Sequence, residues 1–377
     1  MTNFYINRIC RSFYPDIPKV YLYDLSKYQY KFGNRIDIIT WAKTNYKINT
    51  LYEEYFKIYR LRGVNFSPYK EVFEGYPYLP TLPKLIKELK PDIIHAESQL
   101  FLPSYQAIST ASKLNIPSVL TIHGVFADRG FLTNNAQLAY LKTFGAKMFK
   151  LVNKIICLSK GDHDEIIQLG CPKEKISIIP TAVDFDLFKP GKQNSEDWIV
   201  WSGRFVQEKG IKTLIDIAKI VLTKRSINIK FIFIGDGPLL LECMNIVRKD
   251  DTINKSVIFT GWIEREKLAE ILSKSSIFIF PSLKEGMPIS VLEAMSSGLP
   301  ILGSDISGIK ELIIDSYNGY LLKSGNSILF ADKILYLLDN NNIKEKMGDN
   351  SRKQILNKYN FNFVCKQIQN IYEEVYN

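Results

Sequence analysis

The chain has 377 residues, of which 46% are hydrophobic and 23% charged, and 49 Lys and Arg against 39 Asp and Glu give a net charge of +10. This length favours two domains, each large enough to bury its own core, and the composition excludes a disordered or fibrous protein. No apolar run approaches the ~18 residues that span a bilayer, and charged side chains near the start argue against a secretory leader. Five scattered cysteines without a Cys-x-x-Cys spacing favour the reducing cytoplasm and argue against a zinc site.

The positive charge lies mainly in the first half, where residues 1–188 carry 24 Lys and Arg against 17 Asp and Glu. A solubility bias and attraction to an anionic partner both account for this excess. Nucleic acid is not expected as a partner, because no RRM, KH or zinc-finger signature is present; an anionic membrane surface or a phosphorylated lipid fits better. Residues 138–154 have the pattern of a basic amphipathic helix. We expect its apolar stripe to lie in the core rather than in a membrane: Leu141, Phe144, Met148 and Val152.

Strand and helix patterns alternate along the whole chain. Strands are predicted at 35–40, 91–95, 117–123, 154–159 and 175–180, and then at 198–203, 229–235, 256–260, 276–282 and 300–304. This alternation is typical of an α/β protein whose parallel sheets carry helices on both faces. Such sheets bind their ligands at the carboxyl ends of the strands.

The domain boundary is predicted in the polar segment 186–197, which contains Pro and Gly and lacks periodicity. The domains are therefore predicted at 1–188 and 189–358, and a helix is predicted at 359–377. The apolar positions of that helix are Phe363, Ile368, Ile371 and Val375. Aromatic and basic residues interleave over 46–90 without an interpretable pattern, and we expect helices and loops there.

Two loops of the second half have the composition of ligand-binding loops. Glu285 and Glu293 flank a predicted strand-to-helix junction in which Pro288 suits the first helical turn. Carboxylates accept hydrogen bonds from sugar hydroxyls, and a helix N-terminus binds phosphate. Upstream, Arg204 and Lys209 occupy a loop between a strand and a helix that begins near Ile211, and both side chains can bind phosphate oxygens. Alone, either pattern is more often an ordinary charged surface.

Several short motifs follow one another in order, and together they are far more specific than any one of them. They are Gly203-Arg204, Glu208-Lys209-Gly210, Gly235-Asp236-Gly237-Pro238, Gly261-Trp262, Glu285-Gly286, Glu293-Ala294-Met295 and Ser307-Gly308-Ile309. In this respect the chain resembles the retaining glycosyltransferases of the GT-B fold, family 4. The resemblance is strong over 198–322 and weaker over 91–190. It implies two Rossmann-like domains that face each other across a cleft, with the last helix packed back on the first domain.

The resemblance also implies roles for individual residues. Arg204 and Lys209 are expected to hold the diphosphate of the donor, Glu293 its ribose and Glu285 the hydroxyls of its sugar. The other implied donor-binding residues are Gly203, Gly235, Gly237, Trp262, Ile263, Gly286, Met287 and Pro288.

In the first domain, the residue singled out is His123, at the end of the strand predicted at 117–123. A lone histidine at a strand end is more often structural, whereas the resemblance implies that it faces the cleft and orients the substrates or assists proton transfer. Together with Arg204, Lys209 and Glu285 it completes the implied catalytic set. Weaker acceptor-side candidates are Lys19, Phe126, Asp128, Arg129 and Ser159.

The predicted reaction moves a sugar from a UDP- or GDP-linked donor to a hydroxyl of a glycan or glycolipid, with retention, in the synthesis of a cell-surface polysaccharide or glycoconjugate. No metal and no other cofactor are expected. Asp184 and Asp186 have the Asp-x-Asp spacing of metal-dependent transferases of another fold, but their place beside the domain boundary favours a structural role. Asp162 and Asp164 would point to different faces of a helix and could not hold one ion together.

Two departures from the family pattern keep alternatives open. The region 14–19 lacks the usual Gly-Gly turn, and Thr181-Ala182 stands where Asn-Gly usually precedes Val-Asp. A non-catalytic subunit that binds sugar nucleotides and a nucleotide-sugar epimerase of the same fold are therefore the alternatives. A nicotinamide-dependent enzyme is disfavoured, because Gly235-Asp236-Gly237-Pro238 is not a Gly-x-Gly-x-x-Gly fingerprint.

Overall fold

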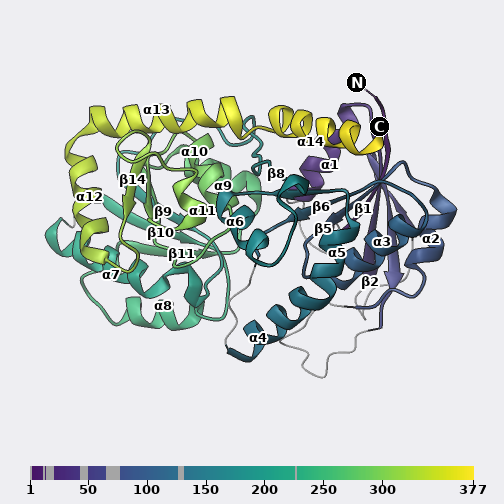
Figure 1. Cartoon of the computed structure of the whole chain (residues 1–377). Coiled ribbons are helices and arrows are strands. Elements are labelled where there is room, and N and C mark those ends of the chain that lie inside the picture. The colour runs from purple at the N-terminus through teal and green to yellow at the C-terminus, as the bar shows by residue number, and fades with distance from the viewer. Residues whose placement is uncertain are drawn as a thin grey trace. The chain divides into compact units, whose positions relative to one another are not determined.

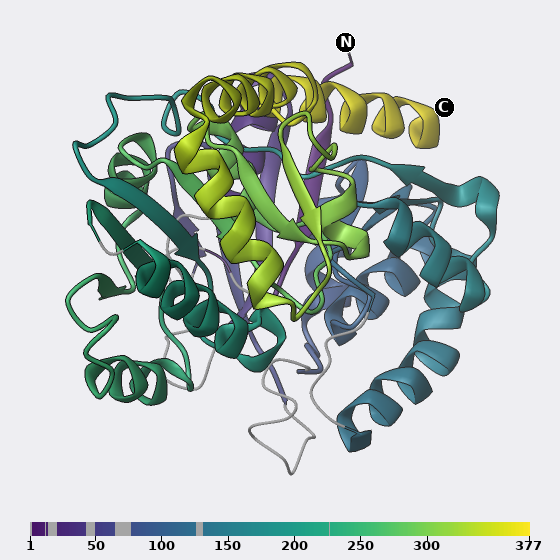
Figure 2. The ribbon, with the colours of Figure 1, turned by 90° about the vertical axis from the view of Figure 1, so that its left-hand side faces the viewer.

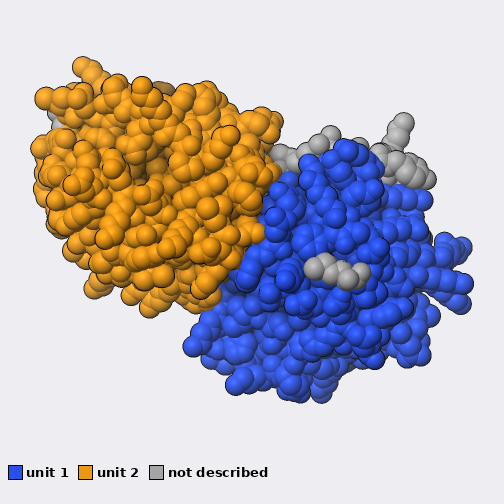
Figure 3. All heavy atoms as spheres, turned by 90° about the horizontal axis from the view of Figure 1, so that it is seen from above, with its two compact units in different colours: residues 1–180, 361–377 blue, residues 181–360 orange. Residues whose placement is uncertain are grey.

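The chain divides into two compact units, coloured separately in Figure 3: unit 1 comprises residues 1–180 and 361–377, and unit 2 comprises residues 181–360. The computed structural model describes residues 2–11, 13, 21–42, 50–64, 77–125, 131–225 and 227–377. The first boundary falls at 180 rather than 188 because the intervening segment is held within unit 2. Val183 N donates to Tyr359 O, and Arg352 Nη1 donates to Phe188 O over 2.8 Å.

Within the described part of unit 1, eight strands form one sheet in the order β3-β4-β2-β1-β5-β6-β7-β8. All neighbouring strands are parallel except β3 and β4. The strands are β1 (Tyr5–Ile9), β2 (Arg35–Ala42), β3 (Thr50–Tyr52), β4 (Phe56–Arg62), β5 (Ile93–Glu97), β6 (Ser118–Ile122), β7 (Lys154–Cys157) and β8 (Ile176–Ile178).

The prediction of helices and loops over 46–90 is wrong for β3 and β4. Strand β4 alternates buried and half-buried residues, and Phe56 and Ile58 pack with Ile36 and Ile38 of β2. This period-two pattern, hidden among many aromatic and basic residues, is the sign of a strand with one face on a core. The antiparallel edge strand β3 follows from the short hairpin that joins it to β4.

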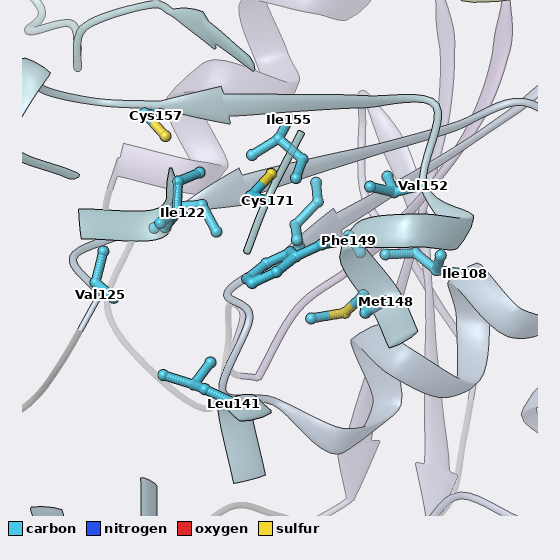
Figure 4. Packing of buried hydrophobic residues seen from close by; sticks show 13 residues of the cluster. Ile108, Ile122, Val125, Leu141, Met148, Phe149, Val152, Ile155, Cys157 and Cys171 are labelled. Carbon is cyan, nitrogen blue, oxygen red and sulfur yellow. The ribbon is translucent and has the colours of Figure 1, made fainter. Parts of the chain in front are cut away.

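Helices cover both faces of this sheet, as Figure 1 shows. They are α1 (Tyr21–Lys31), α2 (Leu82–Leu89), α3 (Leu102–Lys113), α4 (Phe131–Tyr140), α5 (Ala146–Leu151), α6 (Lys160–Gln168) and α14 (Phe361–Tyr376), with a π-helical turn η1 (Leu141–Gly145) and a 3-10 turn η2 (Lys173–Lys175). In one core, shown in Figure 4, Phe149 of α5 lies in the same cluster as Ile155 of β7 and Cys171. All five cysteines are buried free thiols.

The basic segment 138–154 is helical only over residues 138–151, since β7 begins at Lys154, and its apolar stripe differs from the predicted one. Leu141, Met148 and Val152 are buried, as expected, whereas Phe144 is 43% exposed. The π-helical turn widens the helix at this point and rotates the residues that follow Leu141. Phe144 therefore stacks on Tyr140, with ring centroids 5.5 Å apart, at the surface rather than in the core.

The last helix, α14, belongs to unit 1 and packs against α1 and the turn that precedes β2. Gln29 Nε2 donates to Tyr372 Oη over 3.1 Å, and Asn34 Nδ2 donates to Gln369 Oε1 over 2.8 Å. Its buried face runs through Phe361, Val364, Cys365, Ile368, Ile371 and Tyr372. Phe363 was predicted on the apolar face but is 37% exposed. The buried face of the helix passes through Val364 and Cys365 instead.

Unit 2 contains a six-stranded parallel sheet, counted over its described residues, in the order β11-β10-β9-β12-β13-β14. Figure 2 shows helices packed around this sheet. The strands are β9 (Asp197–Ser202), β10 (Ile229–Ile234), β11 (Val257–Gly261), β12 (Ile277–Phe280), β13 (Ile301–Ser304) and β14 (Gly319–Leu322). The helices are η3 (Gln207–Lys209), α7 (Ile211–Lys224), α8 (Leu240–Arg248), α9 (Arg265–Ser273), α10 (Ile289–Ser296), α11 (Ser307–Lys310), α12 (Ser327–Asp339) and α13 (Asn341–Lys358).

The strand order of unit 2 reverses between β9 and β12. From β9 the chain proceeds outward through β10 to β11, and from β12 it proceeds the other way through β13 to β14. The carboxyl ends of β9 and β12 therefore lie side by side at the point of reversal, where open α/β sheets usually bind their ligands.

Candidate active site

The predicted donor-binding loops of unit 2 lie together at this reversal point. Strand β12 pairs with β9 through Ile277 with Ile199 and Phe278 with Val200, so both strands end at the same edge. Residues 203–210 follow β9 and residues 281–288 follow β12. A hydrogen bond from Leu283 N to Glu208 O, 2.7 Å long, joins the two loops.

Two glycines allow these loops to approach closely. Gly210 has a left-handed conformation with φ of +66°, and a Cβ atom there would collide with the carbonyl oxygen of Pro281. A Cβ atom on Gly308, in α11, would collide with the carbonyl oxygen of Gly286. Both positions therefore require glycine if Lys209 and Glu285 are to remain side by side.

The contact that results is an ion pair. Lys209 Nζ lies 2.6 Å from Glu285 Oε1, with side-chain exposures of 23% and 8%. The ammonium group also lies 5.4 Å from the centre of the Phe280 ring. An ammonium group has three N–H donors, so Lys209 can hold Glu285 and still donate to a phosphate oxygen. The pair thus combines an ammonium group that can donate a hydrogen bond to phosphate with a carboxylate that can accept hydrogen bonds from hydroxyl groups.

Arg204 is exposed in the same loop, whereas the next residue, Phe205, is held firmly in place. Phe205 is fully buried, its N–H donates to Asp236 O over 2.9 Å, and its carbonyl accepts from Leu239 N. Gly237 fits this contact because a Cβ atom there would lie 2.7 Å from backbone atoms of Phe205. The guanidinium group of Arg204 is therefore carried on a rigid backbone while remaining open to solvent.

The remaining donor-side residues lie on adjoining elements. Glu293 is 8% exposed on α10, and Met287 is buried just before that helix, where its Sδ accepts from Thr181 N. Pro288 stands at the N-cap and not in the first turn, because α10 begins at Ile289. Trp262 is 55% exposed immediately after β11.

The backbone connects the loop that carries Trp262 with the other donor loops. Gly235 N donates to Gly261 O over 2.9 Å, and Gly203 N donates to Ile234 O over 3.0 Å. Ile263 is half-buried after Trp262. The loops after β9, β10 and β11 thus form one continuous rim.

In unit 1, His123 follows β6 and pairs with Glu97 at the end of β5. His123 Nε2 lies 2.8 Å from Glu97 Oε2, and the side chains are 31% and 3% exposed. Behind Glu97, the guanidinium of Arg8 is fully buried, with its Nε 3.3 Å from Glu97 Oε1. The strand neighbours β1, β5 and β6 bring these residues to the carboxyl edge of the sheet.

Two buried groups of this cluster have displaced pKa values. Burial lowers the pKa of His95 to about 3, so this imidazole is neutral. Burial alone would raise the pKa of the Glu97 carboxyl, but the guanidinium of Arg8 and the hydrogen bond from His123 hold this pKa below its usual range. Glu97 is therefore a carboxylate and a hydrogen-bond acceptor only.

The acceptor-side candidates lie mostly outside the described residues, namely Lys19, Phe126, Asp128, Arg129 and the 14–19 region. Ser159 is described, and its hydroxyl caps α6: it donates to Asp162 Oδ2 over 2.8 Å and accepts from Asp162 N over 3.1 Å. This hydroxyl is 2% exposed and engaged in both directions.

The Asp-x-Asp pair makes a local turn. Asp184 Oδ1 accepts from the N–H groups of Asp186 and Leu187, each over 3.1 Å. Over the residues that the structure describes, no three His, Cys, Asp or Glu side chains gather as they would around a metal ion.

The sequence analysis did not identify Arg8, His95 and Glu97 as site residues. Arg8 lies in β1, which is not among the predicted strands, and Glu97 and His95 are about ninety residues away from it. Glu97 could have been found, because it follows the strand predicted at 91–95 and the carboxyl ends of parallel strands meet at one edge.

Comparisons with known proteins agree with the fold and with the motifs. Residues 19–187 match the sequence profile of glycosyltransferase family 4, and residues 183–354 match that of the glycosyl transferases group 1. A relative from Escherichia coli, named UDP-Gal:alpha-D-GlcNAc-diphosphoundecaprenol alpha-1,3-galactosyltransferase, is 29% identical in an alignment of 311 positions that covers 78% of this chain and 78% of that protein.

Solved structures resemble the chain over nearly its whole length. Sucrose-phosphate synthase from Thermosynechococcus elongatus has a TM-score of 0.79 at 18% identity and covers 98% of both chains. Anabaena HepE in complex with UDP has a TM-score of 0.77 at 16% identity and covers 98% of this chain and 100% of its own.

Two Rossmann-like units with this arrangement of strands define the GT-B class of glycosyltransferases. The chain belongs to glycosyltransferase family 4, which confirms the predicted family. It is a glycosyltransferase of the hexosyltransferase type that uses a nucleotide-sugar donor in polysaccharide or glycolipid biosynthesis.

Proposed function

We propose that the protein transfers a hexose from a UDP-linked donor to a hydroxyl group of a lipid-linked glycan, with retention of the anomeric configuration. The observation that carries this proposal is the Lys209–Glu285 ion pair at the strand reversal of unit 2, with Arg204 exposed in the same loop. One edge of the sheet thus offers cations for a diphosphate and a carboxylate for sugar hydroxyls. The choice of UDP is supported by the name of the E. coli relative and by the UDP complex of HepE.

In this proposal the donor lies along the rim of unit 2. Arg204 and Lys209 bind the diphosphate, Glu285 accepts hydrogen bonds from the sugar, and Glu293 accepts from the ribose. The backbone of Gly286, Met287 and Pro288 lies at the start of α10, whose N–H groups favour an anion. The base would lie beside Trp262 and Ile263, where backbone groups are available to it.

The chemistry follows from where charge develops. As the bond between the anomeric carbon and the diphosphate breaks, negative charge grows on the leaving oxygen, and Arg204 and Lys209 stabilise it. The same oxygen can take the proton of the acceptor hydroxyl on the face from which the diphosphate leaves, which gives retention. His123 would orient the acceptor hydroxyl or the donor sugar. Because two fixed cations neutralise the diphosphate, we propose that transfer needs no metal ion, which a comparison of rates with and without EDTA tests.

The acceptor is proposed to be anchored in a membrane, as the name of the E. coli relative implies for that protein. No described helix is long and apolar enough to cross a membrane. Unit 1 does present a basic and apolar surface on η1 and α5, formed by exposed Lys142, Phe144, Lys147, Lys150 and Leu151. We propose that this surface contacts anionic lipid at the cytoplasmic face of the membrane.

The direct test is a transfer assay with UDP-glucose, UDP-galactose and their N-acetylated forms, and with GDP-mannose as the alternative donor. The acceptor would be a short-chain polyprenyl-diphosphate sugar. A UDP-sugar that gives a product with an α-linkage, by NMR, supports the proposal. Donor binding without transfer over the acceptor panel would instead indicate a non-catalytic subunit, and an inverted linkage would contradict retention.

A further inference from the structure

Glu97 divides its two carboxylate oxygens between a fixed cation and the exposed histidine. Oε1 faces Arg8 Nε at 3.3 Å, and Oε2 faces His123 Nε2 at 2.8 Å. Arg8 is held in turn by Gln29 Oε1 at 2.6 Å and by Ser26 Oγ at 3.2 Å. Glu97 therefore cannot move toward solvent without separating from a buried guanidinium, which would be costly.

A second contact layer keeps this arrangement rigid. His95 Nδ1 lies 2.6 Å from Tyr372 Oη, and His95 Nε2 lies 2.7 Å from Thr121 Oγ1. Both nitrogens of His95 are thus engaged, and the ring is fully buried beside Arg8. Because Tyr372 lies on α14, the last helix of the chain contributes to holding Arg8 and Glu97.

The charge of Glu97 decides the tautomer of His123. A carboxylate only accepts hydrogen bonds, so the ring nitrogen that faces it must carry the proton. In neutral His123 that nitrogen is Nε2, and the lone pair is then on Nδ1. The described residues provide no hydrogen-bond partner for Nδ1.

We propose that Glu97 is a positioning residue that fixes His123 as the Nε2–H tautomer and leaves Nδ1 as the nitrogen that accepts a substrate hydroxyl. The value of this tautomer for transfer rests on the function proposed above for His123. The tautomer itself does not, because it follows from the contacts within unit 1.

Nitrogen NMR tests the tautomer without requiring activity. The chain has only three histidines, so protein labelled with 15N-histidine gives few ring signals, and His123→Asn identifies those of residue 123. Spectra would be recorded near pH ~9, above the ordinary histidine range. We expect a protonated Nε2 and an unprotonated Nδ1 in the wild type. A protonated Nδ1, or an even mixture of the two forms, would overturn the proposal.

Two variants separate positioning from charge. The amide of Glu97→Gln can donate or accept a hydrogen bond, so the single tautomer of His123 should be lost. Glu97→Asp keeps a negative charge beside Arg8, but its shorter side chain withdraws the carboxylate from His123. Circular dichroism checks that each is folded, and if Glu97→Gln does not fold, Glu97→Asp carries the test. We expect kcat to fall about 10- to 100-fold with the KM for the donor nearly unchanged. His163→Gln, which removes a half-buried histidine on α6 that pairs with Asp164, is the matched control and should leave kcat unchanged.

The outcomes distinguish this proposal from the proposed function. If folded variants keep the wild-type tautomer and the wild-type kcat, Glu97 does not position His123. If the tautomer is fixed in the wild type and lost in the variants while the wild type transfers no sugar, the positioning role stands and the proposed function fails.

Discussion

The two units place charged side chains at the same kind of sheet edge in opposite ways. In unit 2, Lys209 and Glu285 meet in loops that touch through glycines, and Arg204 stays open to solvent. In unit 1, a fully buried Arg8 lies behind a buried Glu97, and only His123 reaches the surface. The edge of unit 2 is thus suited to binding a charged ligand, whereas that of unit 1 is suited to holding one imidazole in a fixed state.

This difference has a consequence for mutations. A change at the edge of unit 2 should mainly alter ligand binding and transfer, because its charges are already partly solvated. A change in the unit 1 cluster should also alter stability, because a charge that loses its partner there remains buried.

The largest effect is expected for Arg204→Ala, which removes a cation from the open edge of unit 2. We expect kcat to fall about 100- to 1,000-fold, the usual cost of losing one donor to a developing charge. The melting temperature should change little, because the side chain is exposed. The matched control is Arg225→Ala, an exposed arginine paired with Asp339, which should keep its activity. Full activity in folded Arg204→Ala would show that Arg204 does not stabilise the departing diphosphate.

The glycine contact beneath the ion pair is tested by Gly210→Ala. The left-handed backbone costs about 1–2 kcal/mol for alanine, and the collision with Pro281 O adds about 1–3 kcal/mol. Gly325→Ala is the control, because Gly325 also has positive φ (+76°) but has open space at the Cβ position. Urea unfolding should show the larger loss of stability for Gly210→Ala. Equal losses would mean that the loops of unit 2 do not depend on this close approach.

The buried cluster of unit 1 predicts a pH dependence. Folded His95 stays neutral down to about pH 3, whereas in the unfolded chain it takes up a proton below its usual 6.5. The unfolded state therefore binds more protons, and stability should fall as the pH drops below 6.5, by up to ~1.4 kcal/mol per pH unit. Between about pH 6.5 and 5 this effect is separated from that of carboxyl groups, because carboxyl groups take up protons at lower pH.

The measurement is the free energy of unfolding across that window for the wild type, His95→Gln and His163→Gln. His95→Gln should flatten the slope whatever its stability at neutral pH, and His163→Gln should keep the slope. If the slope is the same in all three proteins, the buried neutral state of His95 is not the origin of the acid sensitivity.

The smallest effect is expected at the ribose end of the donor site. Glu293→Gln keeps the shape of the side chain but removes the charge, and we expect about 10-fold weaker binding of UDP. Glu266→Gln, an exposed change on α9, is the control and should bind UDP as the wild type does. Calorimetric titration gives both constants. Unchanged affinity in Glu293→Gln would place the ribose elsewhere.

The same contrast explains what the sequence could predict. The loops of unit 2 combine a strand end, glycines and charged residues within ten positions or fewer, so Gly203 to Gly210 and Glu285 to Pro288 stood out as candidate ligand loops, and the ordered series of motifs gave them their roles. The fold class followed from the alternation of strands and helices.

Other features depend on contacts between distant segments. Arg8, Glu97 and Tyr372 come from β1, β5 and α14, and no local pattern connects them. Phe144 was assigned to the core because the π-helical turn that rotates it leaves no sign in the apolar spacing. The short edge strands β3 and β14 have too few residues to show a period.

The central claim is that the edge of unit 2 binds a nucleoside diphosphate through Lys209 and Arg204. Calorimetric titration of the wild type, Arg204→Ala and Arg225→Ala with UDP, GDP and ADP, with NAD as a control, tests it most directly. The account predicts that UDP binds best, that NAD does not bind, and that Arg204→Ala, but not Arg225→Ala, weakens UDP binding about 10-fold or more. Folded wild-type protein that binds none of these nucleotides, or binds UDP equally well without Arg204, would contradict it.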